Sequence, residues 1–434
     1  MVGEREEEKE ARVSAWRFVL GVWVASRLFY LVAGAVFART IPFARDHLHY
    51  GRNVAKGHVH YGRNVLRPLD GRNVWGTWDG NWYAAVARLG YPEDNAPSST
   101  AFFPLYEDNL PLSTAFFPLY PMLMRLFAET FGGPVGDRTL QAWGVFISLV
   151  SFLFALYFVY RIAEDGWGRR VAGGTVLTLA FFPTAFFFNA VYTESLFLAL
   201  AAGSVWAARV RKDLLLAAGL AALAALTRHV GVLLLIPLLY EWLGGIREYR
   251  FRGAYLALVP SGLVAYMAFL WHRFGDPLVF QKVQSTDEWQ RTFTPNPVTV
   301  LGNAWAAARR GLHYALDPVA MFEQPRSVAH SVDASHAYNL LALFFVVAML
   351  ALGLRHLPWD LYLYAFLFTV PFALYGTETN PLFNLPRLVL VAFPLFIVLG
   401  VVLRNRWALI AWLIPSAAFS LLLCAMFVTW RWVA

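Results

Sequence analysis

Residues 193–227 read TESLFLALAAGSVWAARVRKDLLLAAGLAALAALT, and this stretch decides the class of fold. It holds two apolar runs, which are separated by a short basic connection containing Arg209, Arg211 and Lys212. Such runs are typical of helices in a lipid bilayer, where no water is present and the backbone must satisfy its own hydrogen bonds. The stretch therefore predicts a helical hairpin in a membrane.

The composition of the whole chain agrees with a membrane protein. Of its 434 residues, 58% are hydrophobic and 15% are charged, whereas about 25% are charged in a soluble domain. The single cysteine, Cys424, excludes an internal disulfide, a thiolate zinc site and an iron–sulfur cluster. The net charge of +8 is divided among short basic clusters between apolar runs, so we expect no nucleic-acid partner.

We expect one all-α, polytopic integral membrane domain over residues 1–434, with about eleven transmembrane helices. The predicted spans are residues 14–38, 139–160, 171–187, 193–208, 214–227, 229–243, 254–271, 337–354, 359–375, 388–403 and 407–428. Arg and Lys gather in alternate connections, and the positive-inside rule then places the N-terminus in the cytoplasm. Two long loops, residues 39–138 and 272–336, are expected outside. The predicted location is the cell membrane, or the endoplasmic reticulum membrane if the chain is eukaryotic.

The first external loop contains tandem repeats. Residues 93–106 read EDNAPSSTAFFPLY and residues 107–120 read EDNLPLSTAFFPLY, while HLHYGRNVAKG at 47–57 is followed by HVHYGRNVLRP at 58–68. The second repeat produces two His-x-His pairs, but no carboxylate or cysteine lies nearby in a favourable pattern. We therefore interpret the repeats as a local duplication and predict neither a metal site nor a cofactor.

The segment WGTWDGNWY at residues 75–83 carries the first candidate site residue. Asp79 is a good N-cap for a short helix through Arg88 that Gly90 would end, and its apolar face of Trp82, Val86 and Leu89 suits an interfacial helix. Alternatively, a carboxylate at the membrane surface, among aromatic rings that stack on sugars, is placed to act as a general base. The two interpretations are compatible.

Four further polar residues are predicted at the outer edge of the membrane: Glu194, Arg228, His229 and Arg387. Glu194 could simply face a helix dipole, and the arginines could extend to lipid headgroups. However, all four map to the same face of the membrane as Asp79, and ionisable groups there are costly unless they pair or bind something. The set suits a phosphate-bearing lipid substrate, with cations on the phosphate and a carboxylate that activates a nucleophile.

Several motifs together resemble a known family. Trp78-Asp79-x-x-Trp82-Tyr83 is followed by AFFPLYP at residues 115–121, FNAVYTES at 188–195, Thr227-Arg228 and LPR at 385–387. In this order they resemble the pattern of the PIG-V-type mannosyltransferases, which are similar to other glycosyltransferases of the GT-C superfamily. The resemblance implies a GT-C-like enzyme that takes mannose from a polyprenyl phosphate on the external or luminal face, without a nucleotide sugar. It also implies that the acidic residue of the first external loop, here Asp79, is the base.

We therefore predict a membrane glycosyltransferase that moves mannose from polyprenyl-phosphate-mannose to a hydroxyl on a lipid, glycan or protein. Its partners would be the lipid bilayer, the donor and the hydroxyl acceptor. Asp79 is the predicted catalytic residue, and Arg228, His229 and Arg387 are predicted to bind the donor phosphate. The predicted substrate-binding residues are Trp78, Trp82, Tyr83, Tyr120, Asn189, Tyr192 and Glu194. The main alternative is a multi-span lipid or sugar-lipid transporter or flippase, which would tend to carry inverted repeats and polar groups near the midplane.

Overall fold

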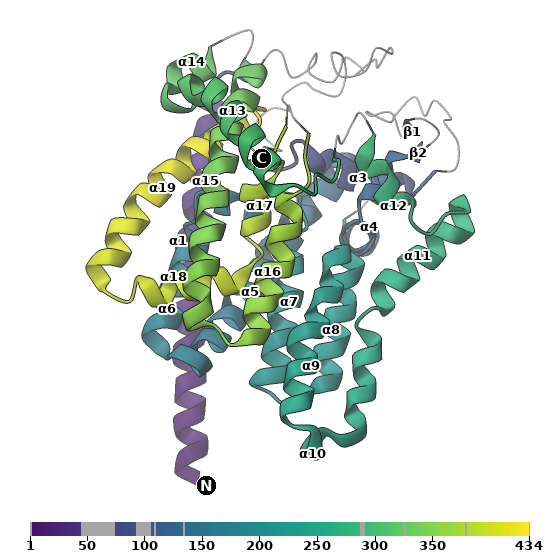
Figure 1. Ribbon diagram of the computed structural model, residues 1–434, viewed down its shortest axis with the longest axis vertical. Coiled ribbons are helices and arrows are strands. Elements are labelled where there is room, and N and C mark those ends of the chain that lie inside the picture. The colour runs from purple at the N-terminus through teal and green to yellow at the C-terminus, as the bar shows by residue number, and fades with distance from the viewer. Residues whose placement is uncertain are drawn as a thin grey trace.

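The computed structural model describes residues 2–44, 74–92, 106–107, 110–132, 135–286, 291–323, 327–377 and 380–433. Helices dominate this part of the chain (Figure 1), and its strands form a small antiparallel hairpin of β1 (Tyr106–Glu107) and β2 (Leu110–Pro111). The prediction of an all-α polytopic fold is confirmed. The two His-x-His pairs and most of the first FFPLY copy lie outside the described residues.

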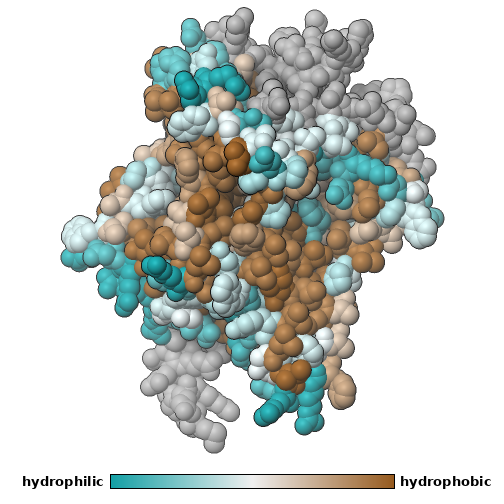
Figure 2. All heavy atoms as spheres, viewed as in Figure 1, coloured by the Kyte–Doolittle hydropathy of each residue, from teal (hydrophilic) through white to brown (hydrophobic). Residues whose placement is uncertain are grey.

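In the described part of the chain, five helical segments are long and apolar enough to cross a bilayer. They are residues Val13–Thr40 of α1 (Val2–Thr40), α5 (Asp137–Trp167), the segment Ile246–Phe274, α15 (Ser327–His356) and α19 (Arg406–Val428). The segment Ile246–Phe274 is made of α10 (Ile246–Tyr249), η4 (Arg250–Leu258) and α11 (Ser261–Phe274). Figure 2 shows a hydrophobic band around the middle of the molecule, with hydrophilic side chains nearer its two ends. This arrangement is what a bilayer requires.

The remaining predicted spans contain shorter helices, and the number of eleven crossings is not confirmed. These helices are α6 (Arg169–Ala180), α7 (Glu194–Arg209), α8 (Leu214–Thr227), α9 (Leu235–Gly244), α16 (Trp359–Ala373) and α18 (Phe393–Val402). At 1.5 Å per residue, a 14-residue helix such as α8 is about 21 Å long, which is less than the ~30 Å of hydrocarbon.

Prolines explain why two predicted spans are interrupted. The predicted span 171–187 ends as α6 at Ala180, shortly before Pro183, and the chain continues as the 3-10 helix η2 (Ala185–Asn189). The predicted span 388–403 is divided between α17 (Leu385–Val389) and α18, with Pro386 and Pro394 at their starts. Proline has no N–H to continue a helix that precedes it, but it fits the first turn of a new one. Both interruptions fall beside the site described below.

Short helices lie at the end of the bundle that contains α3, which is at the top of Figure 1, and others form turns between the longer helices. They are α3 (Asp79–Leu89), η1 (Leu112–Ala115), α4 (Leu119–Phe131), η3 (His229–Leu234), α12 (Val279–Lys282), η5 (Val283–Ser285), α13 (Pro297–Leu316) and α14 (Pro318–Phe322). Helix α5 is the centre of this scaffold, since it contacts α1, α3, α4, α6 and α7.

The second FFPLYP copy packs directly against α3. The ring of Phe116 stacks on Trp82 with a centroid distance of 5.4 Å, and the hydroxyl of Tyr120 donates to the Gly144 carbonyl at 2.8 Å. Pro118 precedes α4 as its N-cap residue. Most of the predicted interfacial face of α3 is therefore covered by protein, since Trp82 and Val86 are buried and Leu89 alone of the three residues is exposed.

The predicted orientation can be tested by cysteine labelling, because the natural Cys424 is buried and should not react. Val298 at the start of α13 is 76% exposed, and Phe251 beside α10 is 93% exposed, at the opposite end of the molecule (Figure 1). We expect an impermeant thiol reagent to label Val298→Cys in intact cells and Phe251→Cys only after permeabilisation. Labelling of Phe251→Cys in intact cells would invert the orientation.

Candidate active site

Two carboxylates and two arginines form a continuous ion-pair network. Arg387 Nη1 lies 2.6 Å from Asp79 Oδ2, and Arg387 Nε lies 2.8 Å from Glu194 Oε1. Arg228 Nη2 lies 2.5 Å from the same oxygen of Glu194. The four residues come from the first turn of α3, the first turn of α7, the residue after α8, and α17. The structure therefore brings together four of the predicted site residues.

The first turn of α3 points the Asp79 carboxylate at Arg387. Trp78 is the N-cap residue of this helix and Asp79 is its first helical residue, so the predicted capping role of Asp79 is wrong. The backbone N–H of Asp79 donates to the Tyr192 hydroxyl at 3.2 Å, and that hydroxyl donates to the Thr77 carbonyl at 3.1 Å. The side chain of Asp79 is thus free of a capping bond and available to the network.

The backbone is strained at positions next to the site. Trp78 has φ 52°, Asn384 has φ 63° and Trp430 has φ 64°, a left-handed region that costs non-glycine residues about 1–3 kcal/mol each. Trp78 directly precedes Asp79, and Asn384 is the N-cap residue of the helix that carries Arg387. The rings of Trp78 and Trp430 lie 5.7 Å apart. Such strain persists only where packing determines the conformation, and it concentrates at functional sites.

Burial separates the roles of the two carboxylates. The side chain of Glu194 is 0% exposed, whereas that of Asp79 is 16% exposed. The side chains of Arg228 and Arg387 are 17% and 13% exposed. Glu194 therefore lies behind the arginines and holds them in position, and Asp79 is the carboxylate of the network that a substrate can reach.

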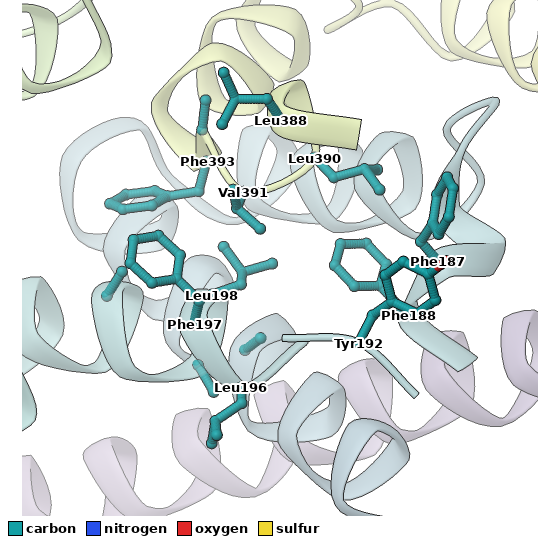
Figure 3. Close-up of a cluster of buried hydrophobic side chains, with 14 of the residues drawn as sticks. Phe187, Phe188, Tyr192, Leu196, Phe197, Leu198, Leu388, Leu390, Val391 and Phe393 are labelled. Carbon is teal, nitrogen blue, oxygen red and sulfur yellow. The ribbon is translucent and has the colours of Figure 1, made fainter. Parts of the chain in front are cut away.

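Aromatic rings of the buried hydrophobic cluster drawn in Figure 3 lie close to the arginines of the network. The Arg387 guanidinium carbon lies 4.9 Å from the ring centre of Tyr192 and 5.9 Å from that of Phe187. Arg228 lies 5.8 Å from the ring centre of Phe197. Rings at these distances attract cations electrostatically. They also exclude water, which strengthens the interactions of the charges above them.

Thr193 and Tyr83 extend the network toward α3. Arg228 Nε donates to Thr193 Oγ1 at 2.8 Å, and the same oxygen lies 3.2 Å from the Tyr83 hydroxyl. Burial raises the pKa of Tyr83 to about 12, so its hydroxyl stays protonated at neutral pH. Tyr83 was a predicted site residue, and Thr193 was not.

Arg291, from the loop between η5 and α13, is a candidate site residue that sequence reasoning missed. Burial and the positive charge of Arg387 lower the pKa of Arg291 to about 10, while the Asp79 carboxylate opposes this shift. The side chain also donates to Gln284 Oε1 at 3.1 Å. A third cation near the network gives it an excess of positive charge. No motif marks Arg291, and the one signal in the sequence was its place in the second predicted external loop, residues 272–336.

Six of the seven predicted substrate-binding residues are buried: Trp82, Tyr83, Tyr120, Asn189, Tyr192 and Glu194. Trp82 and Tyr120 belong to the packed core described above, and Asn189 is 0% exposed and accepts a hydrogen bond from Arg27 of α1. Their side chains support the site from within the fold. His229 lies among the rings of Phe117, Phe280 and Phe372, at centroid distances of about 6 Å, and not in the ion-pair network.

Trp78 differs from these residues because it remains half-buried beside Asp79. Its ring contacts Trp432 edge-on at 5.2 Å, and Trp432 stacks on Phe383 at 5.3 Å. The indole Nε1 of Trp78 is buried without a hydrogen-bond partner. Within the described residues, no group of three or more His, Cys, Asp or Glu side chains is arranged to hold a metal ion.

Comparison with known proteins gives a distant structural likeness. No family model and no curated protein matches the chain. Solved structures to which it is similar include the Archaeoglobus fulgidus oligosaccharyltransferase in the apo form, with a TM-score of 0.40 and 13% identity, covering 94% of this chain and 56% of that chain. The same protein in complex with Zn and sulfate gives a TM-score of 0.36 and 14% identity, covering 79% and 52%.

A third similar structure is ArnT from Cupriavidus metallidurans bound to undecaprenyl phosphate. It gives a TM-score of 0.37 and 15% identity, covering 93% of this chain and 77% of that chain. The present chain thus spans about half the length of the oligosaccharyltransferase and about three quarters of the length of ArnT.

Proposed function

We propose that this chain is a membrane glycosyltransferase that transfers mannose from polyprenyl-phosphate-mannose to a hydroxyl on a lipid, glycan or protein. One observation carries the proposal: Asp79, the accessible carboxylate of the network, lies 2.6 Å from Arg387, in a cluster that also contains Arg228 and Arg291. A base beside several cations suits a reaction in which a hydroxyl attacks a sugar and a phosphate leaves.

Asp79 is the general base in this proposal. Its Oδ2 is held by Arg387, and the side chain keeps accessible surface through which an acceptor hydroxyl can approach. The hydroxyl loses its proton to the carboxylate as its oxygen forms a bond to the anomeric carbon of the sugar. The bond between that carbon and the phosphate oxygen breaks, and its electron pair leaves with the polyprenyl phosphate.

The arginines hold the donor phosphate. A guanidinium has five N–H donors, and the network engages Nη1 and Nε of Arg387 and Nη2 and Nε of Arg228. Each arginine thus has further N–H groups for a phosphate oxygen. Because the arginines stabilise the developing negative charge, the leaving phosphate needs no metal in this scheme.

The choice of mannose and of a polyprenyl phosphate donor rests on the motifs that resemble those of the PIG-V-type mannosyltransferases. Asp79, Thr193, Glu194, Arg228 and Arg387 belong to those motifs, and they meet in one network. We place the reaction on the external or luminal face of a multi-pass membrane protein whose N-terminus is cytoplasmic, as the distribution of basic residues predicts.

The first test of this function is Asp79→Asn. The variant keeps the size of the side chain and an oxygen that can accept from Arg387, so we expect it to fold. Loss of the general base should lower mannosyl transfer by roughly 100- to 10,000-fold, measured with purified protein and labelled polyprenyl-phosphate-mannose.

Asp137→Asn is the matched control, because Asp137 lies 3.4 Å from Arg88 in a pair outside the network. It should retain transfer. Wild-type turnover of Asp79→Asn would remove this residue from catalysis. Donor translocation by the wild-type protein in proteoliposomes, without any transfer, would instead favour the transporter.

The second test concerns the cations. Arg387→Gln removes a charge-assisted donor, which is worth ~1.5–3 kcal/mol, so donor affinity should fall roughly 10- to 100-fold. Arg387→Lys keeps the charge but loses the planar guanidinium group, which bonds to both carboxylates. We therefore expect its donor affinity to lie between those of the wild type and Arg387→Gln.

Binding is measured by titration with polyprenyl-phosphate-mannose, and thermal unfolding confirms that both variants are folded. Arg88→Gln carries the same substitution outside the network and should bind the donor like the wild type. Unchanged donor affinity in both folded Arg387 variants would contradict the assignment.

A further inference from the structure

A second cationic site lies at the opposite end of the helices from the ion-pair network. A cavity of about 260 Å³ is formed where α6 begins, where α18 is joined to α19, and by residues of α1 and α5. In Figure 1, α6 and α18 meet low on the left of the bundle, well away from α3 and α17. Figure 2 shows hydrophilic side chains gathered in this region, next to hydrophobic ones.

Four arginines line this cavity: Arg169, Arg170, Arg404 and Arg406. None of the described residues that line it is acidic. Arg169 is paired with Glu164 at 3.1 Å, and Arg406 lies over the ring of Trp407 at 4.9 Å. The cavity thus carries a concentrated positive charge, and a bound anion would reduce the repulsion between the arginines. The first turn of α6 adds the positive end of a 12-residue helix dipole.

Apart from Tyr160, the other side chains of the lining are apolar, which favours a lipid over a free anion. Phe18, Leu177, Leu403 and Leu409 contribute to the wall. The neighbouring Val402 and Ile410 are 45% and 42% exposed, as expected for side chains that face hydrocarbon. A ligand that fills this cavity therefore needs a negatively charged head and an apolar chain beside it.

Two glycines of α6, Gly173 and Gly174, line this cavity. The backbones of α6 and α18 approach each other closely at Gly174 and Gly400. A Cβ added at Gly174 would lie 3.6 Å from the Gly400 carbonyl oxygen. Gly173 lines the cavity, and a Cβ there would lie 3.5 Å from the ring of Phe18. That is an ordinary van der Waals contact, so a Cβ fits at Gly173, and we expect a longer side chain there to take up part of the cavity.

We infer that this cavity binds an anionic phospholipid, with the headgroup phosphate on Arg170, Arg404 and their neighbours and an acyl chain along Phe18 and Leu409. The site is separate from the donor site, and the inference does not depend on the proposed transfer reaction. Bound there, the lipid would bridge α6, α18 and α19.

The test uses the full-length protein in detergent micelles, titrated with fluorescent phosphatidylglycerol and with phosphatidylcholine that has the same acyl chains. We expect the wild type to prefer phosphatidylglycerol by about tenfold or more, the scale of one charge-assisted hydrogen bond. The double variant Arg170→Gln with Arg404→Gln should lose this preference. Arg247→Gln with Arg252→Gln removes the same charge from exposed positions outside the cavity and should keep it.

A second pair of variants leaves all charges in place. Gly173→Leu should fill the cavity and abolish the preference for phosphatidylglycerol. Gly166→Leu, at an exposed position where an added Cβ meets nothing within 4 Å, should keep it. Unfolding temperatures close to the wild-type value would confirm that each variant is folded.

Three outcomes would overturn the inference. Equal losses in the two arginine pairs would mean general surface attraction, and an unchanged preference in Gly173→Leu would mean that the cavity is not the site. Displacement of phosphatidylglycerol by inorganic phosphate as effectively as by unlabelled phosphatidylglycerol would identify a site for free phosphate.

Discussion

The bridge made by Arg387 between Asp79 and Glu194 is the interaction on which the site depends. Its two carboxylates come from different helices, and the bond to Asp79 joins residues 308 positions apart. A fully buried carboxylate such as Glu194 is tolerable in an apolar environment only when cations pair with it. The bridge therefore fixes the relative positions of α3, α7 and α17 through charge pairing.

The interrupted helices make this bridge possible. If residues 388–403 and the chain before them formed one continuous span, its side chains would project from a regular helix. Instead, α17 is five residues long and starts after Asn384 in a left-handed conformation. Leu388, Leu390 and Val391 on one side and Phe187 and Phe188 on the other form the apolar cluster drawn in Figure 3, which anchors both interruptions. The packed cluster holds the strained backbone in place.

Much of this arrangement was predictable from single residues. Ionisable groups at the ends of apolar runs are rare enough to attract attention, and Asp79, Glu194, Arg228 and Arg387 were identified in that way. Their pairing was not predictable, because it depends on tertiary contacts between distant segments.

The errors at Asp79 and Trp82 share a physical cause. A helix-start pattern favours an N-cap at Asp79 and an interfacial face at Trp82, but contacts with Arg387 and Phe116 override these local preferences. Arg291 carried no local pattern at all. Hydropathy alone predicted continuous spans at 171–187 and 388–403. Proline residues near the breaks before η2 and at α18 explain why the helices are interrupted there.

The order of these pairings along the chain has a consequence for biosynthesis. A ribosome delivers Glu194 to the membrane only 34 residues before Arg228, so this acid gains its first counterion within one helical hairpin. Arg387 emerges much later, and Asp79 has no partner in the network until then. Glu194, which is fully buried, can thus be paired early during insertion, whereas the surroundings of Asp79 are completed only after Arg387 has been synthesised.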